Sequence, residues 1–317
     1  MKPTTIVATA PARVDLAGGW TDVAPYTTVV GGAVCNVAIE LRARATVTGL
    51  STAAEPPSDS LSRAAWDRAG SPRVSVRLES AVPVGSGLGG SSAAGVALAA
   101  ALSVWRGDSA NPADLAELSR STETETLGLA GGCQDHYAAA FGGALLLHCG
   151  KTTAVEQLSL TDETISAFES RVLVAYTGES RMSSRTITAV LDAWRAGEPE
   201  TCDALAAMAS LAPHMAAALR GGDLDTLGLL VAKQWKAQRA LHPTITTPLI
   251  DRIVADAAAA GALGTKALGA SGGGCVLVIT RADRTSTVRD VLGQHAQLLP
   301  LEVARRGVHV DVAETTH

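Results

Sequence analysis

The chain has 317 residues, enough for one large domain or two ordinary ones with a substantial core. Hydrophobic residues make up 47% and charged residues 18%, a balance that excludes extensive disorder. The net charge is −5 and no long run of Lys or Arg is present, so no nucleic-acid or membrane partner is expected. A phosphate ligand is not excluded, because backbone N–H groups and a helix N-terminus can hold one.

The first residues, 1–5, lack a basic stretch followed by an apolar secretion core. No segment is expected to span a membrane, because polar residues interrupt the alanine-rich stretches. The five cysteines are scattered and show neither a disulfide framework nor a CxxC metal spacing. We therefore expect free thiols in a cytoplasmic protein, either a monomer or a homodimer.

The N-terminal half is predicted to alternate strands with helices. Residues 5–10 favour a short strand that ends at Pro11, and residues 33–49 favour a second extended stretch, before a polar loop over 51–60. Residues 73–79 alternate apolar and polar side chains, the pattern of a half-buried strand.

Two helices are predicted next. Residues 91–105 are almost all small and apolar, which predicts a buried helix. Asn111, Pro112 and Asp114 have the order of an N-cap, a first helical proline and a first-turn acid, so they open a helix to about Thr126.

The C-terminal half begins at a boundary near 155–168, which divides the chain into residues 1–160 and 161–317. The predicted elements there are a strand at 171–176, helices near 183–195, 199–220, 223–240 and 247–260, and a strand at 275–279.

A glycine-rich turn is the strongest local feature. It reads Pro83-Val84-Gly85-Ser86-Gly87-Leu88-Gly89-Gly90-Ser91-Ser92-Ala93-Ala94, and it precedes the buried helix. Glycines let backbone N–H groups approach a ligand, and the helix directs its partly positive end at the same place. The serine hydroxyls can bind phosphate oxygens or Mg²⁺. These are the physical requirements of a polyphosphate site.

Two other interpretations fit the same turn. Gly85, Gly87 and Gly90 match a dinucleotide fingerprint with Asp108 downstream, which would make the protein an NAD(P)-dependent oxidoreductase. However, residues 79–83 separate the glycines from the preceding strand, and Asp108 follows a helix instead of a second strand. A purely structural glycine turn is the other interpretation. No GxxxxGK[ST] loop is present, which excludes P-loop chemistry.

The turn resembles the second motif of the GHMP kinase family, a PxxxGLGSSA-type phosphate loop, with one extra glycine as in the fucokinase and heptose-kinase branch. The resemblance implies that Ser92, in preference to Ser91, helps to hold Mg²⁺. It also implies an ATP-binding loop made of Pro83, Gly85, Ser86, Gly87, Leu88, Gly89, Gly90, Ser91 and Ser92.

Two further segments resemble family motifs in the required order. Residues 10–22, which contain Gly-Gly-Trp-Thr-Asp, resemble the first motif and are most similar to fucokinases. Residues 268–275 resemble the third motif, which closes over the active site, and Gly272 and Gly273 are its expected substrate contacts. Three motifs in order across almost the whole chain are far more specific than any one alone.

A fourth segment, residues 131–143, resembles the GGKQDQYAAAFGG stretch of heptose-phosphate kinases. Asp135 aligns with the catalytic aspartate, and Gln134 is expected to contact substrate. A carboxylate can accept the proton that makes a sugar hydroxyl a nucleophile, although an aspartate capping a turn is common beside glycines. Cys133 departs from the lysine of heptose-phosphate kinases, and His136 from a common glutamine; losing the lysine argues against a substrate that already carries a phosphate.

The first motif supplies the other substrate residues. By resemblance, Arg13 lies near the catalytic aspartate and offsets charge on the transferring phosphoryl group; pairing with Asp15 is the alternative. Asp22 matches a position that binds sugar hydroxyls, with Gly19 beside it, and Trp20 would stack on a sugar face or pack in the core.

Three later residues are assigned by resemblance alone. Glu123 matches the family's Mg²⁺ ligand, whereas a helical wheel places Glu123 and Glu125 on opposite flanks and does not choose between them. Arg181 would reach substrate or phosphate, or lie on the surface. Lys266 would contact phosphate or be structural.

The resemblance implies an α+β fold of two domains, with a ribosomal-protein-S5-like N-terminal half and a ferredoxin-like C-terminal half. It implies Mg²⁺- and ATP-dependent phosphorylation of a small-molecule sugar, with the anomeric C1 hydroxyl of a heptose 7-phosphate or a 6-deoxyhexose such as fucose favoured. The alternatives are another GHMP kinase, acting on galactose, arabinose, mevalonate or homoserine, and a non-catalytic sugar and nucleotide sensor on the same fold.

Overall fold

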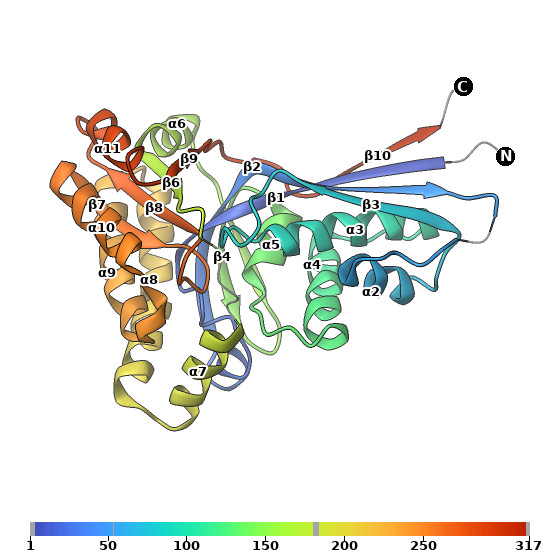
Figure 1. Ribbon diagram of the computed structural model, residues 1–317, viewed down its shortest axis with the longest axis horizontal. Helices are drawn as coiled ribbons and strands as arrows, with labels where there is room; N and C mark the ends of the chain where they lie inside the picture. The colour runs from blue at the N-terminus through green and yellow to red at the C-terminus, as the bar shows by residue number, and fades with distance from the viewer. Residues whose placement is uncertain (1–3, 53, 180–183, 315–317) are drawn as a thin grey trace.

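The computed structural model describes residues 4–52, 54–179 and 184–314 (Figure 1). Within these ranges the strands form two antiparallel sheets, one in the order β10-β1-β2-β4-β5 with β3 also paired to β2, the other in the order β7-β8-β6-β9. The strands are β1 (Thr4–Ala17), β2 (Gly32–Gly49), β3 (Val74–Ser80), β4 (Ala144–Cys149), β5 (Ala154–Leu158), β6 (Val172–Tyr176), β7 (Ala262–Ala267), β8 (Cys275–Thr280), β9 (Gln297–Leu299) and β10 (His309–Glu314).

Helices cover both sheets. They are α1 (Tyr26–Val29), α2 (Ser60–Arg68), α3 (Gly90–Arg106), α4 (Pro112–Ser121), the π-helical turn η1 (Thr122–Thr126), α5 (Gln134–Phe141), α6 (Asp162–Arg171), α7 (Ser184–Arg195), α8 (Pro199–Arg220), α9 (Leu224–Ala240), the 3₁₀ turn η2 (Pro243–Ile245), α10 (Pro248–Ala260) and α11 (Thr285–Leu292). Every helix and strand predicted above is present, with ends that differ by a few residues except in β1 and the helix from Asn111.

The first strand corrects one prediction. β1 does not end at Pro11 but continues to Ala17, where its last residues are all buried. Its pairing with β2 shifts register between Pro11 and Ala12, and β10 pairs only with Thr4–Thr9. The missing N–H of Pro11 therefore falls at a sheet irregularity, where a strand tolerates proline.

The helical face of the larger sheet depends on small side chains. Alanines of α3 pack on alanines of β1 and β2, so the helix lies close to the sheet. The predicted cap of α4 is confirmed, because the Asn111 side chain accepts a hydrogen bond from the Asp114 backbone N–H at 3.0 Å. Helix α2 was not predicted; Asp59 caps it and its Trp66 is buried against the same layer.

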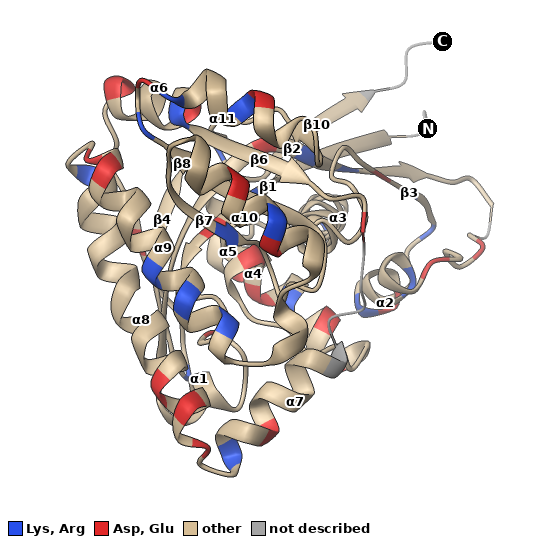
Figure 2. Cartoon of the chain, turned by 60° about the vertical axis from the view of Figure 1, so that its left-hand side comes forward, with Lys and Arg blue, Asp and Glu red and all other residues tan. Residues whose placement is uncertain are grey.

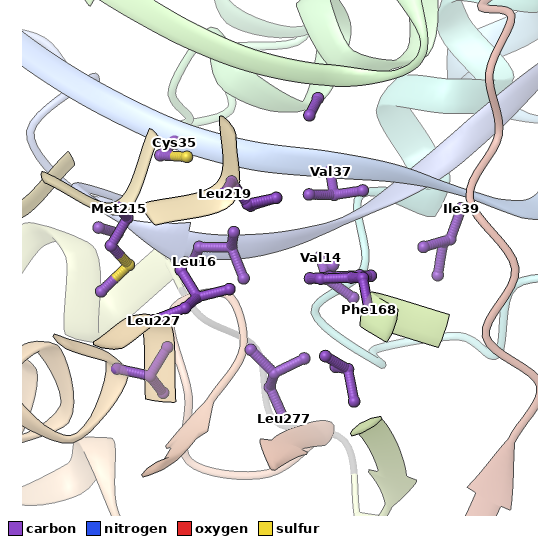
Figure 3. Close-up of a cluster of buried hydrophobic side chains, with 14 of the residues drawn as sticks. Val14, Leu16, Cys35, Val37, Ile39, Phe168, Met215, Leu219, Leu227 and Leu277 are labelled. Carbon is purple, nitrogen blue, oxygen red and sulfur yellow. The ribbon is translucent and has the colours of Figure 1, made fainter. Parts of the chain in front are cut away.

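The opposite face of the larger sheet packs against the C-terminal half. Figure 3 shows this core, in which side chains of β1 and β2 meet side chains of α6, α8, α9 and β8. β10 belongs to the larger sheet although it lies within residues 161–317, so the two sheets do not divide strictly at residue 160. The labelled core residues are Val14, Leu16, Cys35, Val37, Ile39, Phe168, Met215, Leu219, Leu227 and Leu277.

Helix α8 is long and apolar enough to meet the simplest criterion for a membrane span within the described residues. In the fold its Leu205, Met208, Met215 and Leu219 are buried in the two C-terminal cores, as in a core helix of a globular domain. Both acidic and basic side chains occur on the helices around it (Figure 2).

Candidate active site

An open cleft of about 670 Å³ lies between the glycine-rich turn, the end of β1 and the loop before α5. Most of the predicted site residues line it, although they come from segments more than 100 residues apart. They are Arg13, Gly19, Trp20, Asp22, Pro83, Gly85, Ser86, Gly87, Gly89, Gly90, Ser91, Ser92, Glu123, Gln134 and Asp135.

The glycine-rich turn presents backbone to the cleft. Gly85, Gly87 and Gly89 have φ angles of 68°, 75° and 76°, a conformation that side chains with a Cβ rarely adopt. Gly89 is also the N-cap of α3 and supplies no side chain to satisfy the first N–H groups of the helix. The turn and the helix dipole therefore favour an anion at this point.

The third motif supports this turn from behind. The Cys275 N–H donates to the Ser86 carbonyl at 2.8 Å, and a Cβ on Gly87 would lie 2.6 Å from the Leu268 carbonyl. Gly269 and Ala270 consequently line the cleft. Gly272 and Gly273, which the sequence suggested as substrate contacts, do not line it, because they pack against Ile245 and Glu179 instead.

Arg13 and Asp135 form the centre of the cleft. Nε of Arg13 donates to Oδ1 of Asp135 at 2.7 Å, and its Nη2 lies 2.6 Å from the same oxygen. Nη1 of Arg13 donates to the Gly87 carbonyl at 2.6 Å, so the guanidinium connects the aspartate to the glycine-rich turn. Oδ2 of Asp135 lies beside Gly89, where a Cβ would come within 3.1 Å of it.

Asp22 is buried against the loop that leads into α5. Its Oδ2 accepts a hydrogen bond from the Gln134 backbone N–H at 3.0 Å, and Gly132 leaves room for the carboxylate because a Cβ there would collide with it. Burial raises the pKa of Asp22 to about 6, with a further increase from the charges of Asp135 and Asp15. A carboxylate in this position can accept hydrogen bonds from hydroxyl groups of a ligand.

Glu123 faces the N-terminus of α3. Its carboxylate accepts hydrogen bonds from the hydroxyls of Ser91 at 2.8 Å and Ser92 at 3.3 Å, and Nε2 of His136 lies 3.4 Å away. Burial acts to raise the pKa of Glu123, but the contacts with His136 and the serines outweigh it, so the pKa lies below its ordinary value. Glu125 is exposed.

The π turn explains why a helical wheel could not select Glu123. Residues 122–126 leave the α-helical path, and the Leu127 N–H bonds to the Thr122 carbonyl, five residues back. A π turn shifts the direction of the side chains it carries relative to the preceding helix, and such turns are frequent at functional sites.

Two family models match the chain. The description "GHMP kinases N terminal domain" matches residues 59–143, and "GHMP kinases C terminal" matches residues 215–297, together more than half of the chain. The chain belongs to the GHMP kinase family. The predicted family and its two-domain fold are thus confirmed.

Several relatives of this GHMP kinase are sugar kinases by name. A D-glycero-alpha-D-manno-heptose 7-phosphate kinase of Campylobacter jejuni is 28% identical over 85% of this chain and 88% of its own length. An L-fucokinase/L-fucose-1-P guanylyltransferase of Bacteroides fragilis is 25% identical over 90% of this chain, but the chain spans only 36% of that larger protein. A solved D-glycero-D-manno-heptose 1-phosphate kinase from Bacteroides thetaiotaomicron has the same fold, with a TM-score of 0.77 at 23% identity and coverage of 96% and 98% of the two chains.

This GHMP kinase also contains a buried ion pair that its sequence did not predict. Nζ of Lys266 donates to Oδ2 of Asp15 at 2.7 Å and to the Asp15 carbonyl at 2.9 Å, and the lysine is fully buried. Burial lowers the pKa of Lys266, while the carboxylate opposes that shift. Lys266 therefore has the structural role, and Arg13 pairs with Asp135 instead of Asp15.

Other residues singled out in the sequence have different surroundings in this GHMP kinase. The Leu88 side chain is buried in the core, and its carbonyl accepts a hydrogen bond from the Arg13 N–H at 3.0 Å. Cys133 is also buried, with its Sγ 3.3 Å from that of Cys149, so it does not line the cleft. Trp20 borders the cleft but packs with Val23 in the core, and Arg181 lies outside the described residues.

The cleft also includes residues that the motifs did not indicate. Val23, Leu129, Ala130 and Ile187 line it. Leu129 and Ala130 lie directly before the quoted Gly-Gly-Cys-Gln-Asp segment, so extending that segment by two residues would have found them. Ile187 lies on α7, six residues after Arg181, and no residue pattern pointed to it.

Proposed function

We propose that this GHMP kinase transfers the γ-phosphoryl group of ATP to a hydroxyl group of a sugar. The observation that carries the proposal is the position of the Arg13–Asp135 pair. It touches the glycine turn through Gly87 and Gly89, and Asp135 directly follows Gln134, which holds Asp22. A proton acceptor thus stands between an anion site and a hydroxyl-binding carboxylate.

The nucleotide side has suitable ligands for a divalent metal. Glu123, Ser92 and Ser91 offer only oxygen atoms, which Mg²⁺ prefers, and the lowered pKa keeps Glu123 ionised at neutral pH. Within the described residues no group of three or more His, Cys, Asp or Glu side chains could hold a metal alone, so phosphate oxygens and water would complete the shell. Bound there, Mg²⁺ would neutralise charge on the phosphates.

The acceptor side supplies orientation and a base. Asp22 accepts hydrogen bonds from sugar hydroxyls and fixes the ring, while Asp135 accepts the proton of the attacking hydroxyl. The sugar oxygen forms a bond to the γ-phosphorus as the bridging bond to the β-phosphate breaks, and ADP leaves. Arg13 orients Asp135 and adds positive charge where negative charge builds up.

The favoured acceptor is the anomeric C1 hydroxyl of a heptose or of a 6-deoxyhexose such as fucose, giving a sugar 1-phosphate for nucleotide-sugar synthesis. The names of the relatives support this class. Among the described residues that line the cleft, Arg13 is the one Lys or Arg, whereas four are acidic, namely Asp15, Asp22, Glu123 and Asp135. This charge balance favours a neutral sugar over one that already carries a phosphate.

The test is ADP release with Mg·ATP and a panel of L-fucose, D-galactose, L-arabinose, D-mannose, heptose 7-phosphates, mevalonate and homoserine. Turnover with a neutral sugar, and phosphorus NMR that places the new phosphate on C1, is the expected result. Turnover with mevalonate or homoserine alone would overturn the sugar assignment. ATP binding without turnover of any compound in the panel would instead favour the alternative that the protein is a non-catalytic sugar and nucleotide sensor.

A further inference from the structure

We propose that His136 is a positioning residue that holds the metal-binding carboxylate of Glu123 in place. The inference rests on the proposed function, because it takes Glu123 to be a Mg²⁺ ligand. His136 does not line the cleft and touches neither the glycine turn nor Asp22 within the described residues. Its effect on the reaction would therefore pass through Glu123.

The imidazole of His136 is fixed on both sides. It is 1% exposed, its Nδ1 lies 3.0 Å from Oγ of Ser119, and its Nε2 lies 3.4 Å from Oε2 of Glu123. A proton on Nε2 suits both contacts, since the Ser119 hydroxyl can donate to Nδ1 and Nε2 faces the Glu123 carboxylate. Ring tautomers of this kind are set by the partner of the other nitrogen.

Ser119 is itself held by close packing. It is buried on α4, and a Cβ on Gly95 of α3 would collide with its hydroxyl. Gly95 therefore makes room for the serine between α3 and α4. A series of contacts therefore links α3 to Ser119, Ser119 to His136, and His136 to Glu123. Glu123 in turn contacts α3 at Ser91 and Ser92.

Glu123 needs such support because it stands in a π turn and not in a regular helix. The serine hydroxyls approach its carboxylate from the cleft side and would turn to a metal or a phosphate when either is bound. His136 is the contact that remains on the buried side. Partners of this kind, which orient a metal ligand without binding the metal, typically change metal affinity by about 10- to 100-fold when removed.

The position of His136 also joins the two sides of the cleft. It follows Asp135 directly on α5, so the two side chains leave the helix about 100° apart. Asp135 faces Arg13 and Gly89, while His136 faces Glu123. One short helix thus sets the proton acceptor and the metal ligand in a fixed relation.

The experiment measures metal binding directly. Mn²⁺ is titrated into the full-length protein in the presence of a non-hydrolysable ATP analogue, and electron paramagnetic resonance measures the concentration of unbound Mn²⁺. The variants are His136→Leu, His136→Gln and Ser119→Ala, with His148→Leu, an exposed histidine of β4, as the matched control. Circular dichroism and binding of metal-free nucleotide report whether each variant is folded.

We expect His136→Leu to weaken Mn²⁺ binding by about 10- to 100-fold, and Ser119→Ala by less, with metal-free nucleotide binding and KM for the sugar unchanged. His136→Gln, whose amide can also donate to Glu123, is expected to keep most of the affinity. Equal Mn²⁺ affinity in wild type and a folded His136→Leu would overturn the proposal. If His136→Leu does not fold, wild-type Mn²⁺ affinity in Ser119→Ala would overturn it instead.

Failure of the proposed function gives a different result. A wild-type protein that binds no Mn²⁺ beside the nucleotide would remove the metal site itself, and the role of His136 with it. A wild type that binds Mn²⁺ normally but phosphorylates no sugar would overturn the acceptor assignment. The Mn²⁺ affinities of the His136 variants would still support or overturn the role of His136, because they do not depend on the sugar.

Discussion

The glycine turn presents backbone to the nucleotide side of the cleft, whereas charged side chains build the acceptor side. Gly85, Gly87 and Gly89 shape the first through their conformation and supply no side chains. Arg13, Asp22 and Asp135 make the second, and each has a specific partner. Substitutions on the two sides should therefore fail for different reasons.

The largest expected effect is at Asp135, the proposed proton acceptor. Asp135→Asn keeps the size of the side chain but removes its basicity, so kcat should fall by about 10²- to 10⁴-fold. Nucleotide affinity should stay within about twofold of wild type, because the glycine turn is unchanged. Steady-state kinetics and calorimetric titration measure the two quantities, with Glu125→Gln as the exposed control. A parallel loss of nucleotide binding would contradict the division of the cleft.

The next prediction concerns the contribution of the buried Lys266–Asp15 ion pair to the free energy of unfolding. Lys266→Met leaves Asp15 buried without its partner, which should lower the free energy of unfolding by about 3–5 kcal/mol. Urea denaturation would measure it, with Lys233→Met on the exposed face of α9 as the control. Asp15→Leu together with Lys266→Met should recover most of the loss. Equal stability of the two lysine variants would show that the pair is not needed.

On the nucleotide side, replacing a glycine should lower stability through its backbone conformation, and should lower kcat where the added Cβ meets Asp135. Gly89→Ala and Gly107→Ala change the two caps of α3, with φ angles of 76° and 80°, so each should cost about 1–2 kcal/mol of stability. Only the Cβ at Gly89 meets Asp135, since nothing lies within 4 Å of the one at Gly107. We expect kcat to fall by about tenfold or more in Gly89→Ala alone. Equal activity of the two folded variants would contradict the contact.

The smallest effect is a pH dependence of sugar binding. Burial raises the pKa of Asp22 to about 6, so the carboxylate loses its charge as the pH falls through that value. KM for the sugar should rise about tenfold between pH 7 and pH 5, as expected for one titrating group. In Asp22→Asn the KM should be high and flat over this range. A wild-type KM that does not change would remove Asp22 from the sugar site.

The same group contributes to stability in the opposite direction. Its pKa in the folded protein lies above the ordinary 3.8, so the protonated form favours folding. That contribution is complete below pH 3.8 and is lost as the pH rises through about 6. Asp22→Asn should consequently be more stable than wild type at pH 8.

The contrast between the two sides also explains what the sequence could predict. The glycine turn is contiguous and its conformation requires glycine, so the local sequence located it and the helix behind it. Asp135 and Asp22 were located through short segments that resemble family motifs. In both cases the functional signal lies within a dozen residues.

Features that depend on distant partners were not predictable in the same way. The partner of Lys266 is 251 residues away in sequence, and no pattern indicates whether such a lysine faces phosphate or Asp15. The choice of Glu123 over Glu125 depends on a π turn that a regular helical wheel cannot represent. In the third motif, Gly272 and Gly273 were the expected substrate contacts, but Gly269 and Ala270 line the cleft instead. This difference depends on tertiary packing, which the motif does not indicate.

The role of Asp135 is tested by phosphorus NMR on wild type and Asp135→Asn, each saturated with Mg·ATP and the sugar that the panel identifies. Wild type should produce a resonance of a sugar 1-phosphate together with ADP. The variant should hold the same nucleotide and produce almost none of it. Equal product from the folded variant, or inorganic phosphate in place of a sugar phosphate, would contradict the central claim that Asp135 activates a sugar hydroxyl.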